Sequence, residues 1–120
     1  NITMIKYAKT HEWVKIEGDK ATIGLSDHAQ HELGDIVFIN LPQEGDGITA
    51  GEAFCDVESV KAVSDVMAPV SGKVLKVNTD LEDAPETINN DPMGAWICEV
   101  EITAIPDDLM DEAQYAEFIK

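Results

Sequence analysis

Arginine is absent from this chain of 120 residues, and basic residues of any kind are scarce. The eight basic residues are all lysines, against 24 acidic residues, which gives a formal net charge of −16. Nucleic acids and anionic membranes attract clustered positive charge, and phosphate groups favour the bidentate contacts of arginine. We therefore expect no nucleic acid and no membrane as partners. We expect the acidic surface to speed encounters with basic faces of partner proteins.

Long apolar runs and cysteine motifs are also missing. No stretch approaches the roughly 20 apolar residues of a membrane span, and the N-terminal region has no apolar secretory core. Cys55 and Cys98 lie in strand-like stretches without CxxC spacing, so we interpret them as reduced core residues. These features favour the cytoplasm of a bacterium, or the mitochondrial matrix if the protein is eukaryotic.

Motifs of independent catalysis are missing too. The sequence has no GxSxG, no phosphate-binding glycine loop and no paired cysteine and histidine nucleophile, so we expect no enzyme. His28 and His31 have i, i+3 spacing but no further ligands at a known spacing, so we expect no metal. We interpret six aromatic residues as core or helix-docking residues: Trp13, Phe38, Phe54, Trp96, Tyr115 and Phe118.

What the chain does contain is the pattern of a small β protein. Its length is that of one domain, so we expect residues 1–120 to form a single domain. We expect residues 1–5 to be disordered or foreign to the natural sequence, with Met4 as a natural start. Apolar and polar residues alternate from Glu12 to Leu25 around a turn at 17–20, which predicts a hairpin.

Local capping signals predict two helices. Ser26 is a suitable N-cap and Gly34 a suitable C-terminal stop for a short helix over 27–33. Asp111 and Gln114 have capping-box spacing at the start of a C-terminal helix.

Further strands are expected at 35–41, 52–58, 63–68, 73–78 and 95–105, and 80–92 is expected to be mostly loop with a helical turn. The predicted fold is mainly β: a flattened antiparallel barrel-sandwich hybrid with a short helix after the first hairpin and a C-terminal helix.

Lys61 lies at the centre of the hairpin predicted between 52–58 and 63–68, among carboxylates and small residues. A carrier needs an exposed amine on a rigid turn, with a flexible stem that supplies reach. A solvated lysine is nevertheless ordinary in a turn, and the spacing alone favours that interpretation.

A family resemblance favours a carrier function for Lys61 over an ordinary solvated lysine. ESVKAVSDV followed by APVSGKV resembles the attachment hairpin of lipoyl and biotinyl carrier domains, in which the modified lysine corresponds to Lys61. Val60-Lys61-Ala62 differs from the Met-Lys-Met of biotinyl domains and from the Asp-Lys-Ala of 2-oxoacid dehydrogenase lipoyl domains. The stretch KYAKTHEWVKIEGDKATIGLSDHAQHELGDIVFINLP resembles the H proteins of the glycine cleavage system, and the likeness runs from about Lys6 to Ile119.

This resemblance implies a lipoyl-domain-like fold and a non-catalytic carrier with lipoic acid on Lys61. It implies transfer of an aminomethyl group from a pyridoxal-phosphate glycine decarboxylase to an aminomethyltransferase, and of the dithiol to dihydrolipoyl dehydrogenase. A lipoate ligase or lipoyltransferase would attach the group, and a monomer is expected. Two alternatives stay open: an H-like carrier in lipoate relay or sulfur metabolism, and an unmodified interaction domain.

The resemblance also assigns residues around the lysine. The ligase would recognise the hairpin through Glu58, Ser59, Val60, Ala62, Ser64 and Asp65. Glu12 matches a position associated with a cleft that receives the loaded arm, and Asp65 matches the acidic residue after the tip. Glu32 stands where some members have a histidine, while His31 lies one position earlier, and Gly94-Ala95-Trp96 departs from a Gly-Gly-Trp or Glu-Gly-Trp pattern.

Overall fold

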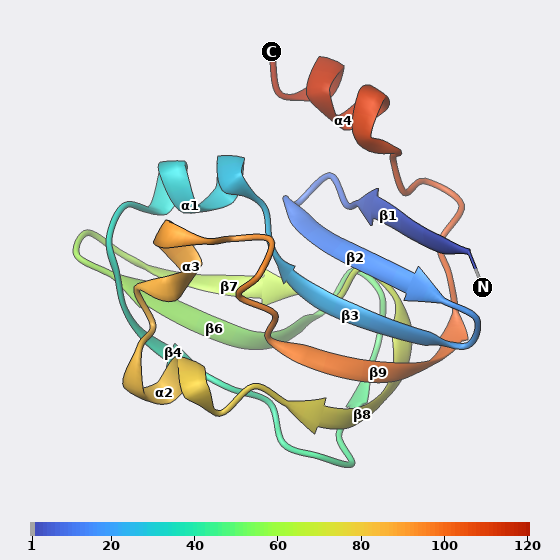
Figure 1. The fold of residues 1–120 in the computed structure, drawn as a ribbon, viewed down its shortest axis with the longest axis horizontal. Helices are drawn as coiled ribbons and strands as arrows, with labels where there is room; N and C mark the ends of the chain where they lie inside the picture. The colour runs from blue at the N-terminus through green and yellow to red at the C-terminus, as the bar shows by residue number, and fades with distance from the viewer. Residues whose placement is uncertain (1) are drawn as a thin grey trace.

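The computed structural model describes residues 2–120 and is built from short strands joined by turns and small helices (Figure 1). The strands are β1 (Thr3–Tyr7), β2 (Glu12–Glu17), β3 (Lys20–Leu25), β4 (Ile36–Asn40), β5 (Gly47–Ile48), β6 (Ala53–Ser59), β7 (Val63–Met67), β8 (Ser71–Val77) and β9 (Cys98–Ala104). The helices are α1 (Asp27–Leu33), α2 (Asp80–Asp83), α3 (Thr87–Asn90) and α4 (Glu112–Phe118).

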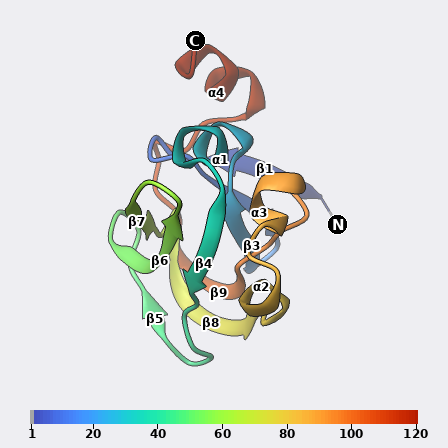
Figure 2. The same cartoon turned by 90° about the vertical axis from the view of Figure 1, so that its left-hand side faces the viewer.

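Two antiparallel sheets make up the body of the molecule. The larger sheet has the order β1-β2-β3-β9-β8-β5, and the smaller has the order β4-β6-β7 (Figures 1 and 2). The sheets do not close into a continuous barrel, and their inner faces enclose one apolar core. The predicted mainly β architecture with a short helix and a C-terminal helix is therefore confirmed.

The first hairpin forms as its alternating pattern predicts. Val14 and Ile16 are buried on β2, and Ile23 is buried opposite them on β3. Gly24 is opposite Trp13, and a Cβ at position 24 would lie 2.4 Å from the Trp13 ring. Only glycine leaves room for the indole there, so this pair fixes how β2 and β3 pack.

Helix α1 has the predicted bounds and caps. The Ser26 hydroxyl accepts a hydrogen bond from the backbone N–H of Ala29 at 3.1 Å. Gly34 ends the helix with φ of 80° and ψ of −162°, a backbone conformation open essentially only to glycine. The sequence signals for this helix lie within the helix and its immediate neighbours, which explains why its bounds could be predicted from the sequence.

Helix α4 is held against β1 by a small second core. The capping box between Asp111 and Gln114 is present, and both of its hydrogen bonds measure 2.8 Å. Tyr115 stacks on Tyr7 with ring centroids 4.3 Å apart, while α4 otherwise protrudes from the body (Figure 2). Phe118 is 47% exposed and therefore not a core residue, but its ring lies 6.1 Å from that of His11 and 6.5 Å from that of Tyr115, which places it at the docking face of α4.

Several other expectations need correction. Residues 3–5 are not disordered: they lie in β1, where Thr3 is opposite Glu17. Asn1 lies outside the described residues. The segment 80–92, expected to be mostly loop with a helical turn, contains two single-turn helices, α2 and α3. Phe38 is 44% exposed on β4 and is therefore not a core residue.

The cysteine prediction is confirmed. Cys55 and Cys98 are free thiols, the first partly buried and the second fully buried. Within residues 2–120, none of the helices has both the length and the apolar character that crossing a membrane requires.

Candidate functional site

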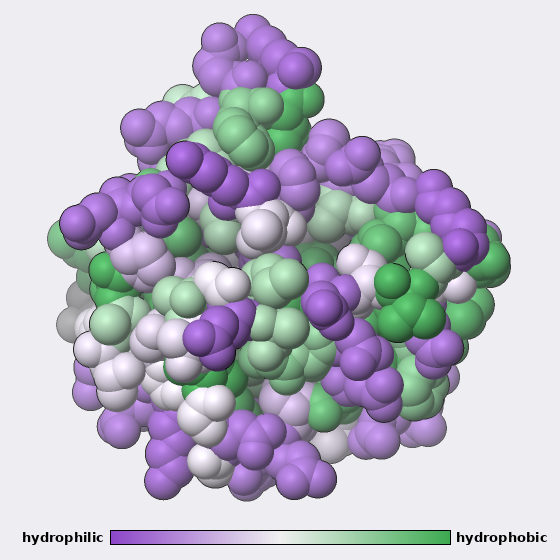
Figure 3. Space-filling model, turned by 180° about the vertical axis from the view of Figure 1, so that it is seen from behind, coloured by the Kyte–Doolittle hydropathy of each residue, from purple (hydrophilic) through white to green (hydrophobic). Residues whose placement is uncertain are grey.

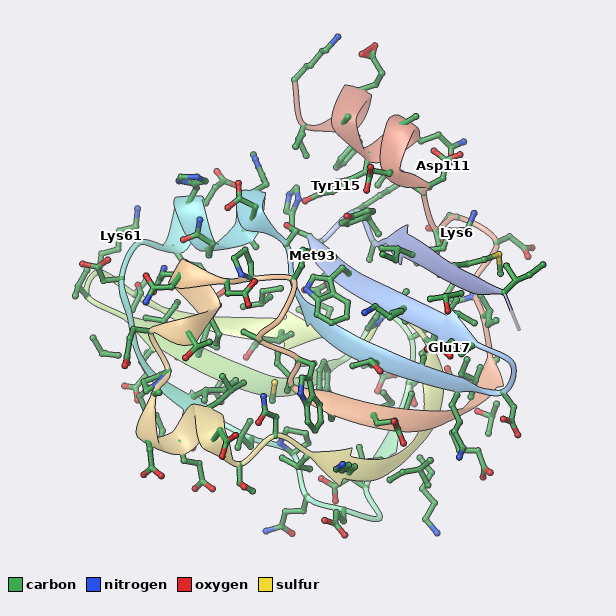
Figure 4. All side chains as sticks on the ribbon, viewed as in Figure 1. Lys6, Glu17, Lys61, Met93, Asp111 and Tyr115 are labelled. Carbon is green, nitrogen blue, oxygen red and sulfur yellow. The ribbon has the colours of Figure 1, made fainter. Side chains whose placement is uncertain are left out.

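The β6–β7 hairpin carries Lys61 at its free end. Glu58 is opposite Val63 in the last pair of the ladder, and the chain turns through Val60 and Lys61. Lys61 is exposed, and its side chain extends away from both sheets (Figure 4). The predicted position of this lysine at a hairpin apex is therefore correct.

Hydrogen bonds fix the backbone of this turn. The Ser59 N–H donates to the Ala62 carbonyl at 2.8 Å, and the Ser59 hydroxyl oxygen accepts from the N–H groups of Lys61 and Ala62 at 3.3 and 3.2 Å. The Val60 N–H donates to the Asp35 carbonyl at 3.0 Å, which ties the tip to the segment before β4. The root of the lysine is therefore held while its side chain remains free.

Lys61 leaves the turn past the C-terminal end of α1. A Cβ at position 34 would lie 3.7 Å from the Lys61 Cε, so the glycine at this helix end leaves space beside the stem. The hairpin and α1 are thus neighbours at the root of the lysine, although they are far apart in sequence.

The remaining predicted hairpin residues surround the tip. Val60, Ala62 and Asp65 are exposed, whereas Glu58, Ser59 and Ser64 are partly buried. Val60 and Val63 are exceptionally exposed for valines, at 69% and 67%. Seen from behind, hydrophobic surface gathers on the side of the molecule where the hairpin lies (Figure 3). The lysine therefore rises from a partly apolar platform.

A cavity of about 130 Å³ lies between α1, the start of β2 and the β6–β7 hairpin. Its lining residues are Thr10, His11, Glu12, Leu25, Ala29, Glu32, Leu33, Val57, Ser64, Asp65 and Val66. Four predicted site residues, Glu12, Glu32, Ser64 and Asp65, therefore meet in one cavity. Lys61 is not among the lining residues.

Glu12 is the buried acid of this cavity, with a side chain only 2% exposed. Its Oε1 accepts a hydrogen bond from the Thr10 hydroxyl, and its Oε2 accepts one from the Met67 N–H at 3.2 Å. Burial raises the pKa of Glu12 from 4.5 to about 7, although these two hydrogen bonds favour the charged form. The carboxyl group can therefore hold or release a proton near neutral pH.

His11 occupies the rim of the cavity. Its backbone has φ of 80°, and its Nδ1 lies 2.8 Å from the Tyr115 hydroxyl. Burial is the main cause that lowers the pKa of His11, with a smaller contribution from His28. No local sequence pattern predicted that His11 lines the cavity, because its neighbours in space come from α1 and α4.

The histidines of α1 point to different partners. His28 Nε2 lies 3.0 Å from Glu32 Oε1, one helical turn away. His31 Nε2 instead lies 3.5 Å from Asp27 Oδ2. The i, i+3 pair of histidines considered from the sequence is thus split between two carboxylates.

Comparisons with known proteins agree on one family. The family model described as "Glycine cleavage H-protein" matches residues 5–120. The glycine cleavage system H protein of Rubrobacter xylanophilus is 54% identical over 111 residues, covering 92% of this chain and 87% of the relative. The probable glycine cleavage system H protein of Pyrococcus abyssi is 49% identical over 118 residues, covering 95% of this chain and 88% of the relative.

A solved structure of the same family has a similar fold. The crystal structure of a glycine cleavage system H protein from Mycobacterium marinum superposes with a TM-score of 0.88 at 41% sequence identity. The match covers 94% of each chain.

Proposed function

Because the chain belongs to the glycine cleavage H-protein family and is thereby the lipoyl-carrying H protein of that system, we propose that Lys61 bears the lipoyl group. The observation that carries this proposal is the exposed amine at the apex of a hydrogen-bonded hairpin. An attaching enzyme needs an accessible Nζ, and a carrier needs an attachment point whose backbone does not move.

The residues around Lys61 fit such a group. The stem of the lysine is flexible, the turn beneath it is closed by Ser59, and Gly34 leaves room beside it. When attached, a lipoyl group would supply a redox-active cyclic disulfide, of which one sulfur can hold a carbon fragment while the other is a thiol, and which is a dithiol once the fragment has left. We propose that Glu58, Val60, Ala62, Ser64 and Asp65 form the hairpin surface that the attaching enzyme recognises.

We propose that the cavity beside α1 receives the cargo end of the arm. Leu25, Leu33 and Val57 give it an apolar wall, while Glu12 and Asp65 offer carboxyl oxygens to a cationic amine. Glu32 adds a third carboxylate at the rim. Since the pKa of Glu12 is about 7, an arriving ammonium group would favour its charged form and gain a charge-assisted hydrogen bond.

Membership of the glycine cleavage system implies work with several enzymes. We propose a pyridoxal-phosphate glycine decarboxylase, an aminomethyltransferase and dihydrolipoyl dehydrogenase as the three partners that the arm visits, and a lipoate ligase or lipoyltransferase as the enzyme that loads it. Tethering raises the effective concentration of the cargo at each active site, so docking can stay weak. We propose that the chain contributes no catalysis of its own. A monomeric state and a cytoplasmic location remain predictions.

Mass spectrometry after incubation with a lipoate ligase, ATP and lipoic acid tests the assignment. We expect one lipoyl adduct on the peptide that contains Lys61, and none in Lys61→Arg. Lys73→Arg is the matched control, because Lys73 is also exposed on a strand of the same fold. An adduct on another lysine, or none at all, would refute the proposal.

A reconstituted glycine decarboxylation assay then separates the remaining alternatives. A lipoylated chain that supports glycine cleavage is the expected result. A lipoylated chain that does not support it would favour lipoate relay or sulfur metabolism, and a chain that is never lipoylated would favour an unmodified interaction domain.

A further inference from the structure

Three potential metal ligands converge at the rim of the cavity. Each of His11, His28 and Glu32 offers one ligand atom, and the three atoms lie within 4.8 Å of one another. His28 and Glu32 are one turn apart on α1, whereas His11 comes from the segment before β2. The rings of His11 and His28 approach with centroids 4.6 Å apart. The cluster therefore depends on tertiary structure and not on one stretch of sequence.

An outer layer of hydrogen bonds orients His11. Its Nδ1 is paired with the Tyr115 hydroxyl at 2.8 Å, and that hydroxyl is 2.8 Å from the buried Ser26 hydroxyl. Metal-binding histidines characteristically use their second ring nitrogen in such a contact, which fixes the ring for coordination. In this arrangement Nε2 of His11 is the nitrogen left for a metal.

The backbone of His11 is held as firmly as its ring. Its φ of 80° is uncommon for a residue with a side chain, and two hydrogen bonds maintain it: His11 N–H to the Ala8 carbonyl at 2.9 Å, and Ser26 N–H to the His11 carbonyl at 3.0 Å. Unusual backbone conformations persist where the surroundings impose them and are concentrated at functional sites.

We propose that His11, His28 and Glu32 form a binding site for a divalent transition metal ion, with Zn²⁺ as the ion that this donor set fits best. Two imidazoles and one carboxylate are a known three-ligand set for zinc, with a fourth position left to water. Mg²⁺ and Ca²⁺ prefer all-oxygen sites, so the two histidines disfavour them.

Only small movements are needed to close this site around an ion. Zinc bonds of about 2.0–2.2 Å hold tetrahedral ligand atoms roughly 3.3–3.5 Å apart. The 3.0 Å contact between His28 Nε2 and Glu32 Oε1 already approximates this spacing. Glu32 is exposed and His28 partly exposed, so both side chains can turn toward His11. The ion would then join α1 to the start of β2 and, through Tyr115, to α4.

The site goes beyond the carrier function and does not require a loaded arm. The test therefore uses the untagged full chain in unlipoylated form, so that no arm thiol binds metal, and titrates Zn²⁺ against a chromophoric competitor. We expect one ion per chain, a raised melting temperature, and the visible absorption of a four-coordinate site when Co²⁺ replaces Zn²⁺. Absence of one-to-one binding would overturn the proposal.

Variants on one helix distinguish this site from adventitious binding. His28→Ala and Glu32→Gln should each weaken Zn²⁺ binding by roughly tenfold or more. His31→Ala is the matched control on the exposed face of the same helix, and it should leave the affinity unchanged. Equal loss in His31→Ala, or no loss in His28→Ala and Glu32→Gln, would refute the site.

Tyr115→Phe tests the outer layer separately. It removes the hydroxyl that pairs with His11 while keeping a ring to stack on Tyr7. We expect affinity to fall by about 10- to 100-fold, as for other partners of metal-bound histidines. Unchanged affinity in a folded Tyr115→Phe protein would show that His11 is not a ligand held in this way.

Discussion

The Oε2 of Glu12 accepts a hydrogen bond from the backbone N–H of Met67 at 3.2 Å and so joins the two sheets. Glu12 begins β2 in the larger sheet, and Met67 ends β7 in the smaller one. A single carboxyl group therefore connects the frame of the molecule to the hairpin that carries Lys61. The protonation state of Glu12 should therefore affect both the free energy of unfolding and the charge inside the cavity.

Stability should fall as pH rises through the titration of Glu12. The folded-state pKa is raised from 4.5 to about 7, so within this window the folded chain binds more proton than the unfolded chain. The stabilisation is complete below about pH 4.5 and is lost as pH passes about 7, a change of about 3 kcal/mol. Urea unfolding of wild type and Glu12→Gln across this range measures it.

Glu12→Gln isolates this effect from the other carboxyl groups. Because glutamine does not titrate, the difference in unfolding free energy between variant and wild type should grow in favour of the variant as pH rises through the window. A difference that stays constant with pH would contradict the raised pKa of Glu12.

The helices and the lysine hairpin could be predicted because their signals are local. Ser26 and Gly34 are the residues that flank α1 in the sequence, and they mark its two ends. Asp111 and Gln114 mark the start of α4 in the same way. Lys61 could be assigned to an apex because the strand patterns on both sides end close to it.

The cavity and the metal cluster could not be predicted in this way. Glu12 and Asp65 line one cavity only after the two sheets pack, and their burial follows from contacts between segments far apart in sequence. His11 meets His28 because β2 and β3 return the chain to the same end of the sheet. Strand β1 was missed because, unlike β2, it is half-exposed and lacks a clear alternating pattern.

Lys61→Ala should abolish lipoylation and carrier activity while leaving stability within about 0.5 kcal/mol of wild type. The side chain is exposed, and none of the turn hydrogen bonds involves it beyond its backbone N–H, which alanine retains. Thermal denaturation and a ligase assay check the two parts. A large drop in melting temperature would mean that Lys61 has a structural role.

Gly34→Ala should slow lipoylation at Lys61. The Gly34 backbone, with φ of 80° and ψ of −162°, lies in a region open essentially only to glycine, so an alanine there costs about 1–3 kcal/mol, and its Cβ would lie 3.7 Å from the Lys61 Cε. Gly18→Ala is the matched control, since Gly18 has φ of 61° and nothing within 4 Å of its Cβ position. Both variants strain a backbone with positive φ and should lose stability, but only Gly34→Ala should slow the ligase. Equal ligase rates would contradict this contact.

Neither cysteine should react with thiol reagents in the folded protein. Burial raises the pKa of Cys98 to about 12 and raises that of Cys55 still further, so almost no thiolate exists at neutral pH. Ellman's reagent should therefore label the thiols only after denaturant is added. Rapid labelling without denaturant would show that the strands carrying Cys55 or Cys98 open readily.

Turnover with the partner enzymes should slow as ionic strength rises. The net charge of −16 attracts basic docking faces at long range, and salt screens this attraction beyond a Debye length of about 8 Å at physiological ionic strength. The measurement is the rate at which dihydrolipoyl dehydrogenase oxidises the reduced, loaded chain over a series of salt concentrations. Free dihydrolipoamide, which is uncharged, is the control substrate, because its oxidation reports any direct effect of salt on the enzyme. We expect the oxidation rate of the chain to fall more steeply with salt than that of free dihydrolipoamide. If the two rates instead change in parallel at every salt concentration, electrostatic docking is excluded.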